Sequence, residues 1–446
     1  MTTPRRRWTT ALILAALTTT SLQGCASQNP GSITVLATWT GTEKAQFQKV
    51  LDAFRQKYGI QVKYLGTRSV SQTLAADLQA GTLPDIAIIP NPGELAQYAS
   101  EGKLRPLDFL TPTERSAFNP AWLLPATKDG EQHIYTLPVK VSLKSIIWYN
   151  PTRLPKQPSP TWGQLESYNQ PTTDPDGALW CMGIADGPNS GWPGTDMIED
   201  IILHQLGQAT YSRWAAGTLP WTSVKDAWIK LGEILANSRG GPHTVLLTDF
   251  TGVGRPMFDS PPGCLLEHQG SFVIGDYQHN PDGGPNGRRP GADFDFYAFP
   301  DKNYPNSSRA DDNTEANRPW EVSADLAGMF NDTPDAHLFM QFLASDDAQK
   351  IWPSLQDSNA FTADKDLNSN IYHGQLRQHI GKILQSASTL CFDASDSMPA
   401  TMRDAFYRAI LEYLNDPAQL DSLLKDLDEI RKGIPQDRFD PHPCGS

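Results

Sequence analysis

The sequence predicts an α/β protein built from two lobes, and three observations support this prediction. Apolar segments typical of buried strands alternate with amphipathic segments over residues 33–102, the pattern of a parallel sheet with right-handed crossovers. Residues 136–151 then form a long strand pattern, after which the composition becomes rich in proline. Finally, 446 residues with 39% hydrophobic content are enough for two or three domains with a large core.

The first segment is predicted element by element from its apolar periodicity. Strands are expected at 33–36, 60–65 and 86–89, and helices at 43–58, 71–80 and 92–100. In parallel α/β sheets, ligands lie beyond the carboxyl ends of the strands. The loops at 38–43 and 90–93 are therefore expected to line a binding site.

Residues 136–151 are interpreted as a crossover strand that runs from one lobe to the other. Residues 139–144 alternate apolar and polar side chains, and 146–148 are continuously apolar. Asn150-Pro151 ends the strand because proline lacks a backbone donor and restricts the residue before it. The alternative is an ordinary central strand of a single domain.

The segment after the crossover is expected to be rich in helices. A strand at 180–184 leads to a polar loop at 187–194 that contains Trp192, and Thr195 is expected to cap a helix at 196–206. Further helices are expected at about 224–237, 335–352, 371–386 and 400–432, the last interrupted at Asp416-Pro417. The leucine stripe within 420–430 is interpreted as core packing rather than a partner-binding face.

The N-terminal residues have the three parts of an export signal. Three arginines at 5–7 precede an apolar run at 11–17, and small and polar residues lead to Leu-Gln-Gly-Cys25. That stretch resembles the lipobox of bacterial lipoproteins, in which the cysteine is lipidated and becomes the mature N-terminus. We therefore expect residues 1–24 to be removed, Cys25 to anchor the chain to the outer face of the membrane, and 25–32 to form a polar tether. Simple secretion is the alternative.

The charge of the chain excludes several partners. It carries −13 at pH 7, and removal of residues 1–24, with three arginines and no acid, would leave −16. Such an acidic chain is not expected to bind nucleic acid or to be held on anionic lipid by charge. No second apolar run approaches the length of a membrane span. We expect an exported monomer.

With Cys25 set aside, four cysteines remain, which in an exported chain predicts two disulfides with three possible connectivities. We favour Cys181–Cys264 and Cys391–Cys444, because each pair falls within one segment of the expected C-terminal lobe. No CxxC pattern and no Cys/His spacing suggests a metal, so neither a metal nor a cofactor is expected.

The sequence contains no enzyme signature. P-loop, dinucleotide-binding, nucleophile-elbow and HExxH patterns are absent, and the nine histidines show no ligand spacing. A glycosidase would need two carboxylates, such as Asp196 and Glu267, facing each other across a cleft. Asp196, Glu199 and Asp200 share an expected helix, and a solvated acidic face explains them better than catalysis.

Tryptophan provides the positive signal. Trp39, Trp192 and Trp320 are expected in loops, next to glycine and polar residues. The apolar C–H faces of a sugar stack on an indole ring, and its hydroxyls need carboxylate, amide or Arg partners. A core position explains any single tryptophan equally well, but the combination favours a sugar site.

Together these segments resemble the extracellular solute-binding lipoproteins of carbohydrate ABC importers, in the α-glucoside-binding branch. The Gly-Trp-Pro-Gly-Thr-Asp196 segment is the most distinctive. The matching stretches cover nearly the whole mature chain in the family's order: 37–54, 84–107, 139–151, 181–203, 220–228, 262–272, 323–352 and 391–410.

The resemblance implies a two-lobed periplasmic-binding-protein fold of type II, each lobe a mainly parallel sheet flanked by helices and joined to the other by hinge strands. Residues 33–146 and 296–350 would form the N-terminal lobe, and 147–295 and 351–446 the C-terminal lobe. Sugar would bind between the lobes and pass to a membrane permease driven by a separate ATPase. The chain would then not be an enzyme; a secreted glycoside hydrolase and an anchored lectin are the alternatives.

The resemblance also implies which residues contact the sugar. Carried over position by position, the contacts fall on Trp39, Thr40, Glu43, Asn91, Gly93, Lys140, Trp148, Trp192, Thr195, Asp196, His268, Gln269 and Asp325. Two stretches depart from the family: Ala324-Asp325 replaces Gly-Asp, and residues 358–362 replace a Gly-Gly-Phe-Ser-Pro-like turn. Both bear on which sugar fits, among glucosylglycerol, trehalose, sucrose and maltose-like sugars.

Overall fold

The computed structural model describes residues 31–123, 125–128, 131–154, 160–167, 178–278, 287–303, 312–440 and 442–445. The expected signal segment 1–24, the lipidation site Cys25 and most of the tether 25–32 lie outside the described residues. Among the residues that are described, no helix combines the length and the hydropathy needed to cross a bilayer.

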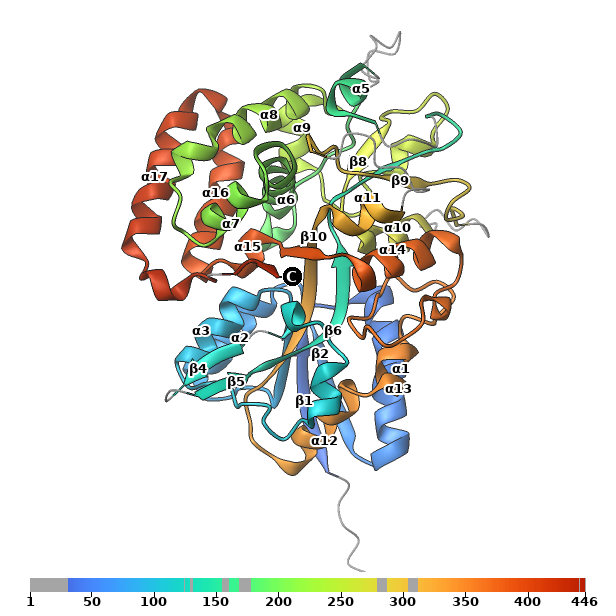
Figure 1. Ribbon diagram of the computed structural model, residues 1–446, viewed down its shortest axis with the longest axis vertical. Helices are drawn as coiled ribbons and strands as arrows, with labels where there is room; N and C mark the ends of the chain where they lie inside the picture. The colour runs from blue at the N-terminus through green and yellow to red at the C-terminus, as the bar shows by residue number, and fades with distance from the viewer. Residues whose placement is uncertain are drawn as a thin grey trace, which may run out of the picture.

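The larger sheet has seven strands, in the order β12-β11-β10-β3-β1-β2, with β6 paired to the other side of β10. Its strands are β1 (Ser32–Ala37), β2 (Gln61–Gly66), β3 (Ile86–Ile89), β6 (Thr136–Leu143), β10 (Pro319–Met329), β11 (Thr389–Phe392) and β12 (Cys444–Gly445). β1 is parallel to β2 and β3, as the sequence predicts, whereas β10 is antiparallel to β3 and β6. β6 and β10 lie side by side along the long axis of the molecule, β6 running from the lower half toward the upper half and β10 running back (Figure 1).

A second sheet of three strands lies beyond the crossover. β7 (Ile146–Tyr149) is its central strand and pairs antiparallel with β8 (Leu266–His268) and β9 (Asp295–Ala298). This pairing departs from the mainly parallel sheet expected for the second lobe, since both neighbours of β7 are antiparallel to it. β4 (Pro125–Lys128) and β5 (Glu131–Ile134) form a separate hairpin.

Helices pack around both sheets. In chain order they are α1 (Gly41–Tyr58), α2 (Val70–Ala80), α3 (Pro92–Ser100), α4 (Pro112–Ser116), α5 (Trp162–Ser167), α6 (Trp192–Ile201), α7 (Gln208–Ala215), α8 (Lys225–Ala236), α9 (Gly241–Leu247), α10 (Ile274–Gln278), α11 (Asp312–Asn317), α12 (Pro334–Leu343), α13 (Asp346–Ile351), α14 (Gln375–Ser386), α15 (Ala394–Ser397), α16 (Ala400–Asn415) and α17 (Leu420–Gly433). A π-helical turn, Ile202–Leu206, continues α6. Helices α6 to α9, α16 and α17 gather on one side of the upper half (Figure 1), where the leucine stripe of α17 is buried in their shared core, as predicted.

Helix α1 illustrates how the sequence determines the buried face and the end of a helix. Phe47, Val50, Leu51 and Phe54 are buried on one face of the helix, the spacing expected of an amphipathic helix packed on a sheet. Gly59 then ends the helix with φ at 73°, a left-handed conformation that strains residues with a Cβ. The predicted helix and its stop are both confirmed.

The crossover at 136–151 is also confirmed. β6 belongs to the seven-stranded sheet and β7 to the three-stranded one, with Lys144 and Ser145 between them. β10 pairs with β6 from Val322 to Gly328, so two strands rather than one cross this region. β11 and β12 extend the larger sheet, although the predicted division of the chain groups their residues with the C-terminal lobe.

Several local predictions are wrong. Asp196, Glu199 and Asp200 are buried in α6 instead of forming a solvated acidic face. Trp180 makes isolated bridges to Ser238 and Leu266 rather than forming a regular strand at 180–184. Helix α6 begins at Trp192, because Gly191 takes a left-handed N-cap conformation (φ 113°) and the proline that follows favours the first turn, so Thr195 lies within the helix. The buried ring of Trp320 lies in β10 instead of a loop.

Both predicted disulfides are confirmed. Cys181 is joined to Cys264 with their Cα atoms 5.4 Å apart, and Cys391 is joined to Cys444. The second bond connects β11 to β12, so it fixes the end of the chain to the larger sheet close to the crossover.

Candidate functional site

A cavity of about 490 Å³ lies between two halves of the molecule, one built around the seven-stranded sheet and the other around the three-stranded sheet and the helices beyond the crossover. Strands β6 and β10 contribute Lys140, Ser142 and Ser323, and the helical half contributes Trp192 and Tyr407. The two loops predicted at the carboxyl ends of β1 and β3 also reach this cavity, because parallel strands end at one edge of a sheet.

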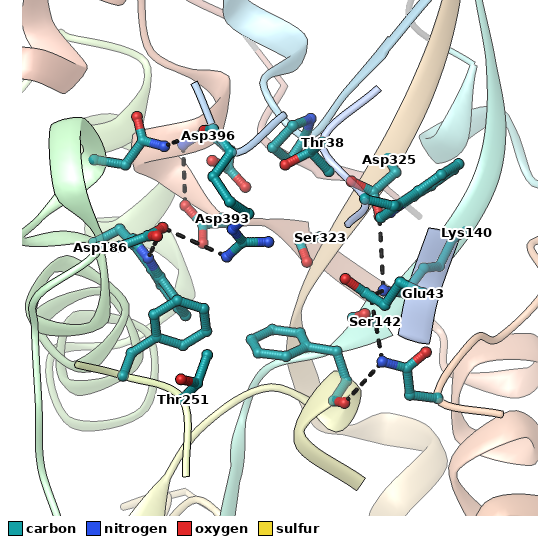
Figure 2. Close-up of a pocket in the computed structure, with 18 of the residues that line it drawn as sticks. Thr38, Glu43, Lys140, Ser142, Asp186, Thr251, Ser323, Asp325, Asp393 and Asp396 are labelled. Carbon is teal, nitrogen blue, oxygen red and sulfur yellow. Dashed lines mark hydrogen bonds and ion pairs between the residues drawn. The ribbon is translucent and has the colours of Figure 1, made fainter. Parts of the chain in front are cut away.

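One wall of the cavity is organised around Lys140 on β6. Its Nζ lies 2.5 Å from Glu43 Oε1 and 4.0 Å from Asp325 Oδ2, with the three side chains converging as Figure 2 shows. Asn359 donates to the same Glu43 oxygen at 3.2 Å, and Trp39 Nε1 donates to Asp325 Oδ2 at 3.2 Å. Each carboxylate is thereby held in a fixed orientation.

The pKa values of these two carboxyl groups are shifted in opposite directions. Burial acts to raise the pKa of Glu43, but the Lys140 ammonium, helped by Arg68, outweighs it and brings the pKa below its usual value. Burial raises the pKa of Asp325 above its usual value, since Lys140 is farther from it and the Glu43 charge acts in the same direction as burial. Glu43 is therefore a fixed acceptor for a ligand hydroxyl.

Lys144 organises the opposite wall. Its Nζ lies 2.5 Å from Asp196 Oδ2 and 3.0 Å from Asp393 Oδ2, and all three side chains are buried. Burial acts to lower the pKa of Lys144, but the surrounding carboxylates outweigh it and raise the pKa well above its usual value. Lys144 is thus a permanent cation at the point where the chain passes from one sheet to the other.

Aromatic rings complete the cavity on the side of α6. Trp192 is partly exposed, and its Nε1 donates to Asp186 Oδ2 at 3.0 Å. Its ring meets Phe250 edge-on at 4.8 Å and Phe272 at 5.9 Å, while Lys144 Nζ lies 5.1 Å from its ring centre. An indole held in this way offers a flat apolar surface to a ligand.

Several contacts hold the two halves together around the cavity. Arg68, beyond β2, lies 3.5 Å from Asp186 in the loop before α6. On the other side, Asn91 Nδ2 donates to Asp396 Oδ1 at 2.8 Å. These pairs enclose the cavity between segments that are far apart in the sequence.

The predicted contact residues divide into two groups. Eight of them line the cavity: Trp39, Thr40, Glu43, Asn91, Lys140, Trp192, Asp196 and Asp325.

The other five lie outside its lining. A Cβ on Gly93 would come within 2.2 Å of the Met398 carbonyl, so this glycine serves close packing. Trp148 is fully buried and donates from Nε1 to the Gln269 carbonyl at 2.8 Å. His268 Nε2 is bonded to Asp200, and Thr195 Oγ1 donates to the carbonyl of Trp192. In this structure these residues lie behind the walls of the cavity.

Sequence reasoning missed many lining residues, among them Arg68, Lys144, Asp186, Phe250, Phe272, Asn359, Asp393, Asp396, Arg403 and Tyr407. Lys144 had a usable signal, since a lysine next to a continuously apolar strand segment needs a buried partner. Asp393 had a signal as well, because aspartate is a preferred N-cap residue. In the structure its side chain accepts from Asp396 N at 3.0 Å and caps α15.

The chemistry of the lining suits a neutral polyhydroxyl ligand. Eight carboxylates and four cations line the cavity, so an anionic ligand would be repelled. Glu267, the second carboxylate of the glycosidase alternative, lies on β8 outside the lining and accepts a hydrogen bond from Tyr277. Asp196 and Glu267 therefore do not form a pair facing each other across this cavity.

The chain is similar in sequence to several known solute-binding proteins. The model of the bacterial extracellular solute-binding protein family matches residues 38–241. The alpha-glucosides-binding periplasmic protein AglE of Rhizobium meliloti (strain 1021) is 31% identical over 409 residues, which are 87% of this chain and 85% of the relative. The osmoprotective compounds-binding protein GgtB of Synechocystis sp. (strain PCC 6803) is 31% identical over 419 residues, which are 91% and 94% of the two chains.

Solved structures agree on the fold. The bacterial solute receptor AcbH, described with a preference for β-D-galactopyranose, superposes with a TM-score of 0.73 at 16% identity over 90% of this chain and 99% of the receptor. A chitin oligosaccharide binding protein superposes with a TM-score of 0.71 at 16% identity, covering 91% and 98% of the two chains. At these identities the likeness concerns the fold alone.

Proposed function

The chain belongs to the family of bacterial extracellular solute-binding proteins, the sugar-binding components of ABC transporters, and we propose that its ligand is an α-glucoside. The observation that carries the proposal is the cavity between the two halves, where a partly exposed indole meets fixed carboxylates and ammonium groups. Its volume of about 490 Å³ accommodates a small saccharide. The family relation makes the chain a binding protein rather than an enzyme.

Two further observations favour an α-glucoside within this class. Two relatives at 31% identity are named for α-glucosides and for osmoprotective compounds, and both are aligned over most of their length. Glucosylglycerol, trehalose, sucrose and maltose each combine a glucose ring with a second polyol or ring. In our proposal, the Lys140 and Lys144 sides of the cavity bind hydroxyls while Trp192 covers an apolar ring face.

The contact residues in this proposal are those of the expected set that line the cavity. Glu43 and Asp325 accept hydrogen bonds from hydroxyls, Lys140 donates to them, and Asp196 accepts on the opposite wall. The lobes would be 33–146 with 296–350 and 147–295 with 351–446, and contacts from both would favour the closed state, since only differential contacts shift such a balance.

Calorimetric titration of residues 26–446 tests the proposal. The ligands are glucosylglycerol, trehalose, sucrose, maltose and glucose, with galactose as a control. We expect saturable one-to-one binding of at least one α-glucoside, with the sugar recovered unchanged. Failure of every α-glucoside to bind, or a slow heat of turnover with release of reducing sugar, would refute it.

We also propose that the chain is exported, lipidated at Cys25 and active as a monomer that docks on ABC permease subunits. The support is the arginine, apolar and Leu-Gln-Gly-Cys25 pattern of the sequence. Replacing Cys25 with alanine in a producing cell is expected to move the protein from the membrane fraction to the soluble fraction. Retention of the variant in the membrane fraction would contradict the lipid anchor.

A further inference from the structure

Three carboxylates from separate elements meet at the wall of the cavity. Asp196 comes from α6, Glu321 from β10, and Asp393 from the residue directly after β11. One oxygen of each lies within 4.8 Å of the others, and all three residues are at most 2% exposed. Oxygens that bind one Ca²⁺ at about 2.3–2.6 Å are separated by at most about 5 Å, so the three atoms fit around a single ion.

Glu321 is the member of this cluster that lacks a partner. Its residue is fully buried, and neither carboxylate oxygen accepts a hydrogen bond from any part of the chain that the structure describes. The backbone of Glu321 is fixed, because its N–H donates to Ser145 Oγ at 2.7 Å and its carbonyl accepts from Lys144 N at 2.9 Å. A buried carboxylate without a partner is costly, so its two oxygens point to a cation that completes the site.

The protein cation beside the cluster satisfies only part of it. Lys144 Nζ contacts one oxygen of Asp196 and one of Asp393. Glu199 adds a further buried carboxylate, which accepts from the backbone N–H groups of the two residues after Asp393. One ammonium group thus faces several carboxylates in a region of low dielectric, where excess charge of one sign needs a counter-ion.

We propose that Asp196, Glu321 and Asp393 bind a divalent cation, with Ca²⁺ as the best fit. A set of carboxylate oxygens without nitrogen or sulfur favours a hard ion, and Ca²⁺ tolerates irregular geometry better than Mg²⁺ does. Asp196 and Asp393 also line the cavity, which gives the ion a route to the site.

Such an ion would connect the two halves of the molecule. It would link α6 to β10 and to the segment after β11, next to the crossover at Lys144 and Ser145. Two of its ligands form part of the cavity wall, so ion and sugar would each alter the affinity of the other by the same factor. Binding of the ion to the sugar-free chain can be measured whichever sugar the cavity takes.

The test uses residues 26–446, freed of metal by chelation, and the variant Glu321→Gln, which keeps the size of the side chain and removes its charge. Ca²⁺ is titrated by calorimetry, and Tb³⁺ luminescence is excited through Trp192, whose ring centre lies 5.1 Å from Lys144 Nζ. We expect one Ca²⁺ per chain and sensitised Tb³⁺ emission from the parent. Glu321→Gln is expected to weaken Ca²⁺ binding by more than about tenfold, because loss of even an outer-shell partner has an effect of this size.

A matched control and a second readout separate ion binding from a structural role. Asp426→Asn removes an exposed carboxylate of α17 and is expected to leave both signals unchanged. Thermal melting with and without Ca²⁺ should show stabilisation of the parent and of Asp426→Asn by Ca²⁺ and no response of Glu321→Gln, whereas a structural role alone would shift the melting temperature equally in both conditions.

Three results would overturn the proposal. The first is no Ca²⁺ binding by the parent up to about 10 mM, which is tenfold above the weakest extracellular calcium modules. The second is equal Ca²⁺ affinity of the parent and Glu321→Gln. The third is tighter binding of Mg²⁺ than of Ca²⁺, which would refute the assignment of the ion.

Discussion

Replacing Trp192 with alanine is expected to weaken sugar binding by about 1–3 kcal/mol, a factor of about 5 to 150 in Kd. An aromatic side chain buries about 150–250 Å², and a sugar ring covers roughly half of that, or about 100 Å². At about 25 cal/mol per Å² this corresponds to roughly 2–3 kcal/mol. The expected range extends down to about 1 kcal/mol because Phe250, Phe272 and Lys144 already cover parts of the Trp192 ring, which leaves less of it for the sugar.

The assay is calorimetric titration with the sugar that binds the parent most tightly, after circular dichroism has shown that the variant is folded. Trp162→Ala provides a matched control, because Trp162 is also partly buried and carries a lysine ammonium 5.2 Å from its ring centre, yet lies outside the cavity lining. Unchanged affinity of folded Trp192→Ala would remove this indole from the site. An equal loss in Trp162→Ala would show that the effect is not local.

Three further predictions concern stability. Lys140→Met should lower the free energy of unfolding at pH 7 by about 3 kcal/mol in urea titrations, because it leaves the carboxylate of Glu43 without its cation. Burial raises the pKa of Glu267 from 4.5 to about 8. Between these two pH values the folded state keeps a proton on Glu267 that the unfolded state has released. The stability from this proton is fully present below about pH 4.5 and lost as the pH rises through 8, so Glu267→Gln should gain up to about 4 kcal/mol relative to the parent over this range. Replacing Cys391 and Cys444 together with alanine should cost about 4 kcal/mol, the chain-entropy value for a sequence separation of 53 residues.

Each of these predictions has a control and a contradicting result. Lys225→Met removes an ammonium whose partner Asp421 is exposed, and should leave the free energy of unfolding nearly unchanged. If Lys140→Met lowers the free energy of unfolding no more than Lys225→Met does, the claim that the buried Lys140–Glu43 pair stabilises the fold is refuted. For Glu267→Gln, a stability difference from the parent that is constant from pH 5 to pH 8 would refute the raised pKa. For the cysteine pair, a parent with reduced disulfides that is as stable as the oxidised parent would contradict the expected contribution.

The sequence predicted the parts of the fold that depend on local periodicity. The strand and helix pattern of residues 33–100 placed the loops at 38–43 and 90–93 at one edge of the sheet, and both reach the cavity. Trp320 was predicted in a loop because a tryptophan next to polar residues is typical of a loop. In the structure it lies on β10, an interior strand of the larger sheet, and is fully buried.

The rest of the site could not be predicted because it depends on pairing between distant segments. Asp393 and Asp396 reach the cavity because β11 pairs with β10, a register that no local pattern specifies. Asn359 contacts Glu43 across 316 residues of sequence. Lys144 was overlooked because its partners, Asp196 and Asp393, lie on elements that only the tertiary structure brings together.

A crystal structure of residues 26–446 with the sugar selected by titration tests the central claim most directly. Our account predicts one sugar in the cavity, with a ring face against Trp192 and hydroxyls within hydrogen-bonding distance of Glu43 and Lys140. A sugar bound elsewhere on the chain, or one in this cavity without contact to Trp192 or Lys140, would contradict it.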